Sequence, residues 1–139
     1  MDVKTVKIGM VGYGTVGMGV ARILAENASQ ITARTGLKLE LACVVDNDVQ
    51  RPREHPLPEG LMTDDISVLL NDSSIEIALE LVGGTTVAKD IQIQMLNAGK
   101  QVVTANKALL AEHGQRLYKA ALDAGRCIGF EASCCGGIP

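Results

Sequence analysis

A glycine-rich run between an apolar segment and a helical one limits this chain to a small number of folds. Residues 6–12, VKIGMVG, are almost continuously apolar, which is typical of a strand buried on both faces. From Val16 onward apolar residues recur at helical spacing. Between the two segments lie Gly12, Gly14 and Gly17 in the pattern G-x-G-x-x-G. The run therefore predicts a strand, a tight turn and a helix.

The three glycines are each suited to a separate task. Gly12 permits a tight turn from strand to helix, Gly14 lets the backbone approach a pyrophosphate closely, and Gly17 lets the helix lie against the strand. The free N–H groups of the first helical turn would then point at the phosphates. A tight turn without a ligand is the alternative, and the motif alone does not exclude it. Support for a dinucleotide site must therefore come from the rest of the chain.

Apolar runs and helical patterns alternate along the remainder of the 139 residues. Strands are predicted at 37–46, 61–65, 75–84, 100–106 and 126–133, and helices at about 66–70, 85–97 and 108–124. Residues 26–36 are taken to lengthen the first crossover, and residues 47–60 form a polar, proline-rich loop. Such alternation implies βαβ units with right-handed crossovers. We therefore expect one dinucleotide-binding domain over residues 1–139, an α/β Rossmann-type fold with a doubly wound, mostly parallel sheet and helices on both faces.

Composition narrows the class of protein further. Aromatic residues make up 2% of the chain, so the core must consist of smaller aliphatic side chains and methionine. The net charge of −3 gives no electrostatic reason to expect nucleic acid or an anionic membrane as a partner. No signal peptide or membrane-spanning run is visible, which predicts a soluble, cytoplasmic protein. The four cysteines lack the spacing of a zinc site or a redox CxxC, so reduced thiols are expected.

An acidic residue at the end of the second predicted strand supports the dinucleotide interpretation. The Asp46 carboxylate is placed to accept hydrogen bonds from an adenosine ribose, although a solvated aspartate is the alternative. A free carboxylate here favours NAD because it repels a 2′-phosphate. Arg51 and Arg53, just downstream, would instead pair with such a phosphate, unless they are simply solvated. The choice between NAD and NADP therefore stays open.

Two further segments follow predicted strands and would border the same crevice. One is ELVGG, residues 80–84, whose paired glycines let the backbone pass close to a nicotinamide ribose. The other is TANKALLAEHG, residues 104–114, in which Lys107 stands where a strand gives way to a helix. Lys107 would bind a substrate carboxylate, donate to a carbonyl oxygen, or be solvated. His55 and His113 are expected at the surface, and no catalytic triad or metal-ligand cluster is recognisable.

Four segments together resemble one known family. VGYGTVGMGVARIL, ELVGG, GKQVVTANKALLAEHG and FEASCCGGIP, in this order, are similar to the N-terminal NAD(P)-binding domain of homoserine dehydrogenase, and the similarity covers essentially the whole chain. The resemblance implies an oxidoreductase that interconverts L-homoserine and L-aspartate 4-semialdehyde in threonine, methionine and isoleucine biosynthesis. Two other readings are a nucleotide-sensing regulatory module and another NAD(P)-dependent semialdehyde or sugar dehydrogenase. Neither explains the TANK segment as well.

The resemblance also assigns roles to individual residues. It places Lys107 at the active site, in contact with nicotinamide and substrate. It implies a monovalent cation, usually sodium, held by backbone carbonyls. The expected cofactor contacts are Gly12, Tyr13, Gly14, Thr15, Val16, Gly17, Asp46, Gly84, Thr85 and Lys107, and the expected cation ligands are Glu131, Cys134, Gly136 and Ile138.

This chain departs from the family pattern at several positions. Cys134 and Cys135 replace a valine and a small residue, which weakens the transfer of the cation site. Asn47 replaces an arginine beside the strand-two acid, which favours NAD slightly. The chain stops at Pro139, before the family's substrate-binding and dimerisation region. We therefore expect it to bind nucleotide without turning over homoserine, and we expect the full-length enzyme to be a homo-oligomer with a small-molecule substrate.

Overall fold

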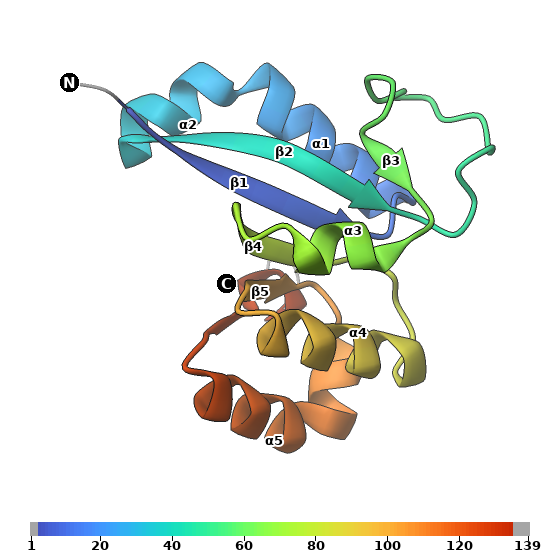
Figure 1. Ribbon diagram of the computed structural model, residues 1–139, viewed down its shortest axis with the longest axis vertical. Coiled ribbons are helices and arrows are strands. Elements are labelled where there is room, and N and C mark those ends of the chain that lie inside the picture. The colour runs from blue at the N-terminus through green and yellow to red at the C-terminus, as the bar shows by residue number, and fades with distance from the viewer. Residues whose placement is uncertain (1–2, 135–139) are drawn as a thin grey trace.

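Six parallel strands form a single open sheet in the computed structural model, which describes residues 3–134 (Figure 1). The strand order is β3-β2-β1-β4-β5-β6, and every neighbouring pair is parallel. The strands are β1 (Lys4–Val11), β2 (Leu37–Val45), β3 (Met62–Thr63), β4 (Ile75–Glu80), β5 (Gln101–Thr104) and β6 (Ile128–Gly129). The expected α/β class with a doubly wound parallel sheet is confirmed.

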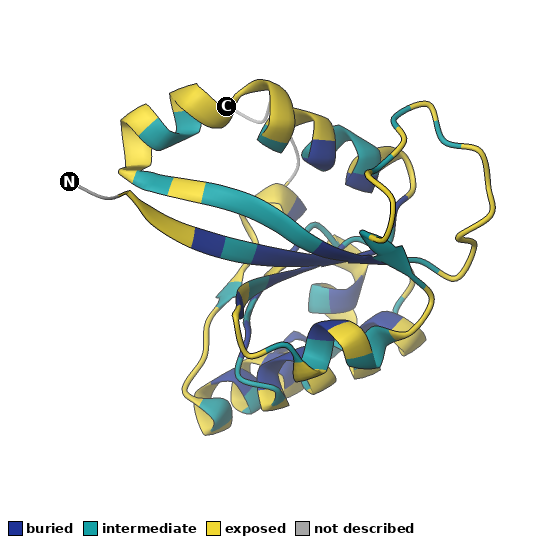
Figure 2. Cartoon of the chain, turned by 45° about the horizontal axis from the view of Figure 1, so that its top comes forward, coloured by how far each residue is buried: buried dark blue, intermediate teal, exposed yellow. Residues whose placement is uncertain are grey.

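Helices cover both faces of this sheet. Figures 1 and 2 show α1 and α2 on one face, and α3, α4 and α5 on the other. The helices are α1 (Thr15–Glu26), α2 (Ala28–Thr35), α3 (Ile66–Asn71), α4 (Thr86–Asn97) and α5 (Lys107–Ala124), and a short 3₁₀ helix, η1 (Glu131–Cys134), follows β6. Within the described residues no helix is both long enough and apolar enough to span a membrane.

The strand order reverses at β1, which lies between β2 and β4. Chain segments leaving β1 and β4 therefore diverge to opposite faces and open a crevice at the carboxyl edge, where α/β proteins of this kind bind ligands. Backbone hydrogen bonds hold the strand ends together at this point. The N–H of Gly12 donates to the carbonyl of Val45 at 2.8 Å, and the N–H of Leu81 donates to the carbonyl of Val11 at 2.8 Å.

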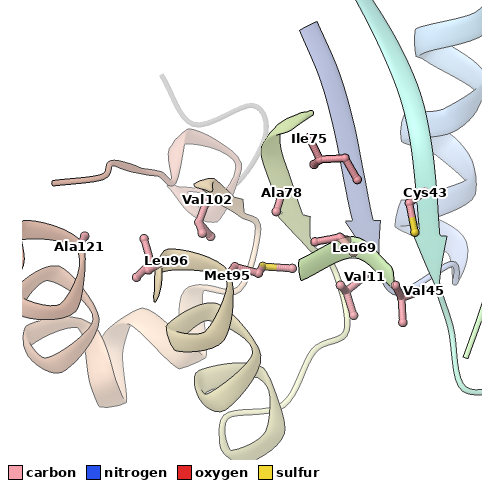
Figure 3. Close-up of a cluster of buried hydrophobic side chains, with 10 residues drawn as sticks. All are labelled: Val11, Cys43, Val45, Leu69, Ile75, Ala78, Met95, Leu96, Val102 and Ala121. Carbon is pink, nitrogen blue, oxygen red and sulfur yellow. The ribbon is translucent and has the colours of Figure 1, made fainter. Parts of the chain in front are cut away.

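The core has one layer on each face of the sheet, because successive strand residues point to opposite sides. On the α1 face, Ile8 and Met10 of β1 pack with Ala21 of α1 and Val44 of β2. The opposite layer is drawn in Figure 3, where side chains of α3, α4 and α5 meet the strands. Its members are Val11, Cys43, Val45, Leu69, Ile75, Ala78, Met95, Leu96, Val102 and Ala121. Figure 2 shows that burial concentrates along the sheet, while the outer helix faces are exposed.

Two local predictions were wrong. Residues 26–36 do not simply lengthen the crossover, since they contain α2, whose C-cap Gly36 has a left-handed conformation with φ 71°. The sixth strand is confined to Ile128–Gly129, and the residues after Phe130 turn into η1. The helix expected after the paired glycines is confirmed, since α4 begins at Thr86 with Thr85 at its N-cap.

Candidate functional site

Two of the three motif glycines are required by the packing of the turn itself. Gly12 has φ +98°, and a Cβ there would lie 2.6 Å from the carbonyl oxygen of Leu81. A Cβ on Gly17 would lie 2.3 Å from the carbonyl oxygen of Gly12, so α1 approaches the turn as closely as its backbone allows. A larger side chain at either position would strain the backbone or push the helix away from the strand.

Gly14 differs from these two glycines because no described residue fills the space beside it. Its φ of −82° is open to any residue, and a Cβ there would meet no atom within 4 Å. Gly14 is the N-cap of α1, and its carbonyl accepts the first helical hydrogen bond, from the N–H of Met18 at 2.9 Å. The N–H groups of residues 15–17 precede that bond and lie at the positive end of the helix dipole. The geometry suits an anion that approaches the backbone closely.

The Asp46 carboxylate is hydrogen-bonded to the backbone of the glycine turn. One oxygen accepts the backbone N–H of Tyr13 at 2.7 Å, and the other accepts the N–H of Asp48 at 2.9 Å and the guanidinium of Arg53 at 3.0 Å. Burial alone would raise the pKa of the Asp46 carboxyl, but these hydrogen bonds and the charge of Arg53 lower the pKa below its ordinary value. Asp46 is therefore charged, and its oxygens already accept hydrogen bonds from the chain at the place predicted for a ribose contact.

Arg53 and Tyr13 complete this connection between the turn and the proline-rich loop. The Arg53 side chain is 7% exposed, and its guanidinium donates to the carbonyl oxygens of Tyr13 and Asp48 and lies 5.7 Å from the centre of the Tyr13 ring. Tyr13 is fully buried, and its hydroxyl donates to the carbonyl of His55 at 2.8 Å. Burial raises the pKa of Tyr13, with Arg53 acting weakly in the opposite direction. Arg53 is therefore not solvated, whereas Arg51 is exposed.

Glu80 organises the other half of the crevice, and sequence reasoning gave it no role. This fully buried carboxylate accepts the backbone N–H groups of Val82 at 2.9 Å and Gly83 at 3.4 Å. It also accepts the side-chain amide of Gln92 at 2.9 Å and the hydroxyl of Thr104 at 2.8 Å. The available signal was a charged residue directly after the apolar run Ile77–Leu79, because a buried carboxylate requires several donors.

Asn106 joins the loop after β4 to the start of α5. Its side-chain oxygen accepts the N–H of Leu109 at 3.0 Å, which caps α5, and its amide nitrogen donates to the carbonyl of Gly84 at 2.6 Å. The hydroxyl of Thr104 accepts the backbone N–H of Asn106 at 3.0 Å. Gly84 itself has φ +73°, a conformation that favours glycine. The ELVGG and TANK segments thus form one hydrogen-bonded unit.

A cavity of about 290 Å³ brings the glycine turn and the TANK segment together. Its lining includes Val16 from the start of α1, Gly83 from the loop after β4, and Lys107, the first residue of α5. Val16 is 55% exposed and Lys107 is exposed, so both side chains are accessible from the crevice. Of the residues predicted for the nicotinamide side, Lys107 lines this cavity, whereas Gly84 and Thr85 are not among its lining residues.

A second cavity, of about 270 Å³, lies at the carboxyl ends of β1 and β2. Asp46 and Asn47 border it, together with Asp64. The remainder of its lining is mainly apolar and includes Ile66, Val82, Val87 and Ile91. These apolar residues were not predicted as site residues, since nothing in their local sequence separates them from ordinary helix and loop positions.

Half of the predicted cation ligands can be located. Glu131 and Cys134 lie in η1, which is held to the end of β5 by the hydroxyl of Ser133, donating to the carbonyl of Thr104 at 3.0 Å. Gly136 and Ile138 lie outside the described residues. No group of three or more His, Cys, Asp or Glu side chains suited to a metal occurs in residues 3–134.

Comparisons with known proteins agree with one another. The sequence model of the homoserine dehydrogenase NAD-binding domain matches residues 12–131. Over 136 residues, 98% of this chain, the identity is 39% to homoserine dehydrogenase from Corynebacterium glutamicum and 34% to that from Bacillus subtilis. The crystal structure of S. aureus homoserine dehydrogenase at pH 7.5 superimposes with a TM-score of 0.85 at 35% identity, over 94% of this chain and 34% of that one.

The chain spans 30% and 31% of the two curated relatives, so the likeness concerns one domain of a longer enzyme. Within that domain, the family match includes the glycine turn, Asp46, Glu80 and the TANK segment. The chain therefore belongs to the homoserine dehydrogenase family, as its NAD-binding domain.

Proposed function

We propose that this chain binds NAD(P)(H) across the carboxyl edge of its sheet and provides the cofactor site of a homoserine dehydrogenase. The observation that carries the proposal is the open space beside Gly14, at the N-terminus of α1. In an ordinary turn, any residue could stand at the position of Gly14, because the position is neither crowded nor at positive φ. A pyrophosphate lying against this backbone gives a reason for glycine there.

The two cavities suggest how the cofactor lies. The pyrophosphate would contact the N–H groups of Thr15 and Val16. The adenosine would extend along the Asp46 side of the turn, where the mainly apolar cavity lies. The nicotinamide would extend over Gly84 and Thr85 toward the cavity lined by Lys107. This direction follows from the chain leaving β1 and β4 on opposite sides of the crevice.

Bound there, NAD(P)(H) would supply hydride transfer between its nicotinamide and the alcohol carbon of L-homoserine or the aldehyde carbon of L-aspartate 4-semialdehyde, while a general acid/base would move the hydroxyl proton. Lys107 is the side chain of this domain best placed to hold a substrate carboxylate or polarise its carbonyl oxygen. Glu80 also borders the cavity, but it is fully buried and takes its hydrogen bonds from the chain. Its part is to hold the loop after β4 and the end of β5 together.

The proposal also implies a metabolic pathway, because the reaction belongs to threonine, methionine and isoleucine biosynthesis. We propose that the 139-residue polypeptide binds cofactor but does not oxidise homoserine by itself. A sodium ion, a homo-oligomeric assembly and a cytoplasmic location stay predictions.

The proposal is tested by isothermal calorimetry, in which the 139-residue chain is titrated with NADH and, separately, with NADPH. We expect saturable binding of at least one of them. In the Gly14→Val variant we expect no detectable binding, since the added side chain occupies the space of the pyrophosphate. The fold should survive, because that space is otherwise open.

Gly19→Ala is the matched control, because Gly19 lies in α1 and a Cβ there also meets nothing within 4 Å. It should bind like the unaltered chain, since alanine suits a helix interior better than glycine. Full affinity in a folded Gly14→Val variant would refute the pyrophosphate assignment.

A further inference from the structure

The Asp46–Arg53 ion pair is nearly enclosed within the chain. The Asp46 side chain is 12% exposed, the Arg53 side chain is 7% exposed, and their nearest charged atoms are 3.0 Å apart. The Nε of Arg53 is buried and has no hydrogen-bond partner among the described residues. A pair this enclosed cannot be treated as two independent surface charges, because little water lies between them to screen either one.

This pairing changes what the carboxylate at the end of β2 means for cofactor choice. A free carboxylate there binds the ribose hydroxyls of NAD and repels the 2′-phosphate of NADP. In this chain the Asp46 charge is balanced by Arg53, and its oxygens already accept N–H groups from Tyr13 and Asp48. The repulsion that would select NAD is therefore largely offset before any cofactor binds.

A cavity beside the glycine turn adds a second, independent observation. It is lined by Gly14 and Thr15 on one side and by Arg51, Arg53 and Glu54 on the other. Arg51 is exposed, so its guanidinium is available to a ligand. Glu54 is the one acidic residue in this lining, against two arginines.

Arg53 also fixes the loop that carries Arg51. Its guanidinium donates to the carbonyl of Asp48, at 2.8 Å, and to the carbonyl of Tyr13 in the turn. The backbone N–H of Arg51 donates to the same Asp48 carbonyl at 3.4 Å. The loop is thereby held against the start of α1, with Arg51 beside the phosphate-binding backbone.

We propose that Arg53 determines cofactor specificity as a positioning residue, because it neutralises Asp46 and places Arg51 where a 2′-phosphate would lie. The chain consequently accepts NADPH at least as well as NADH, contrary to what Asp46 and Asn47 suggest from the sequence. This inference rests on the proposed dinucleotide function and extends it to the class of cofactor.

The test compares dissociation constants for NADPH and NADH at one fixed ionic strength, since phosphate contacts are screened by salt. For the unaltered chain we expect NADPH to bind as tightly as NADH or more tightly. In Arg53→Met, which keeps an unbranched side chain but removes the guanidinium, the ratio of NADPH to NADH dissociation constants should rise about tenfold.

A variant without the charges of Asp46 and Arg53 separates the effect of charge from the effect of a disturbed loop. In the double variant Asp46→Asn/Arg53→Met the ratio should fall back toward that of the unaltered chain. A ratio that stays as high as in Arg53→Met would show that the charge of Asp46 has no part in the effect, and it would overturn the neutralisation on which the proposal rests. Arg116→Met, which removes an exposed arginine from α5, is the matched charge control and should leave the ratio unchanged.

The outcomes distinguish this inference from the proposed function. If the unaltered chain binds neither dinucleotide, the proposed function itself fails. If it binds NADH more tightly than NADPH, the function stands and the specificity proposal is overturned. This comparison needs no variant, so it decides the question even if Arg53→Met does not fold.

Discussion

At the residue scale, the crevice depends on polar groups whose partners lie far away in sequence. Gly12, Gly14 and Gly17 could be predicted because their motif is local and each role follows from backbone geometry. Glu80 could not, since its donors Gln92 and Thr104 come from α4 and β5. Hydrogen bonds between residues that are distant in sequence produce no periodic pattern from which they could be predicted.

The Glu80 network provides a residue-scale prediction. Glu80→Ala leaves the buried Gln92 amide and Thr104 hydroxyl without their acceptor, so the free energy of unfolding should fall by about 3 kcal/mol or more. Glu80→Gln should cost only about 1 kcal/mol, because Gln92 has an unpartnered side-chain oxygen that accepts from the new amide after a flip. Urea denaturation of both variants measures the difference. Equal stability of Glu80→Ala and the unaltered chain would contradict the role of this carboxylate.

The cofactor preference depends on how Asp46, Arg51 and Arg53 are arranged in space, and their order in the sequence does not give that arrangement. From sequence, Asp46 favours NAD, while Arg51 and Arg53 look like one basic pair. The structure separates the two arginines, because Arg53 is buried against Asp46 and Arg51 remains exposed. The loop of residues 47–60 has no periodic pattern, so its backbone path could not be derived from the sequence.

At the element scale, buried strands and long helices were predictable and marginal elements were not. β1, β4 and α5 follow from continuous apolar runs or helical spacing. α2 contains no buried residue, so it lacks the apolar stripe by which a helix is recognised. β6 is a two-residue strand, and its apolar neighbour Phe130 packs edge to face on Tyr118 with ring centres 5.9 Å apart.

The start of α5 provides an element-scale prediction, because Asn106 both caps the helix and binds the loop after β4. Asn106→Ala should lower the free energy of unfolding by about 2 kcal/mol, through loss of the cap and of the bond to Gly84. Asn106→Asp retains the cap oxygen but loses the amide donor, so it should lose about half as much. Thermal and urea unfolding of the two variants check this order, and an Asn106→Ala variant as stable as Asn106→Asp would contradict the role of the cap.

At the scale of the whole molecule, the alternation of apolar runs and helices was enough to predict the sheet and the edge that carries the site. Parallel strands joined by helices leave their carboxyl ends at one edge, so the glycine turn, the ELVGG segment and Lys107 had to meet there. The structure places Val16 and Lys107 around one cavity, as that reasoning requires. The shape of the cavities depends on side-chain packing and could not be obtained in the same way.

The central claim is that a nicotinamide dinucleotide binds along this edge with its pyrophosphate at the start of α1. Nuclear magnetic resonance of the ¹⁵N-labelled chain during a titration with NADPH tests it most directly. We expect the largest amide shifts on residues 14–17, with further shifts at 82–87 and 105–108. If saturating NADPH leaves residues 14–17 unperturbed, or perturbs only the opposite edge of the sheet, the dinucleotide does not bind as proposed.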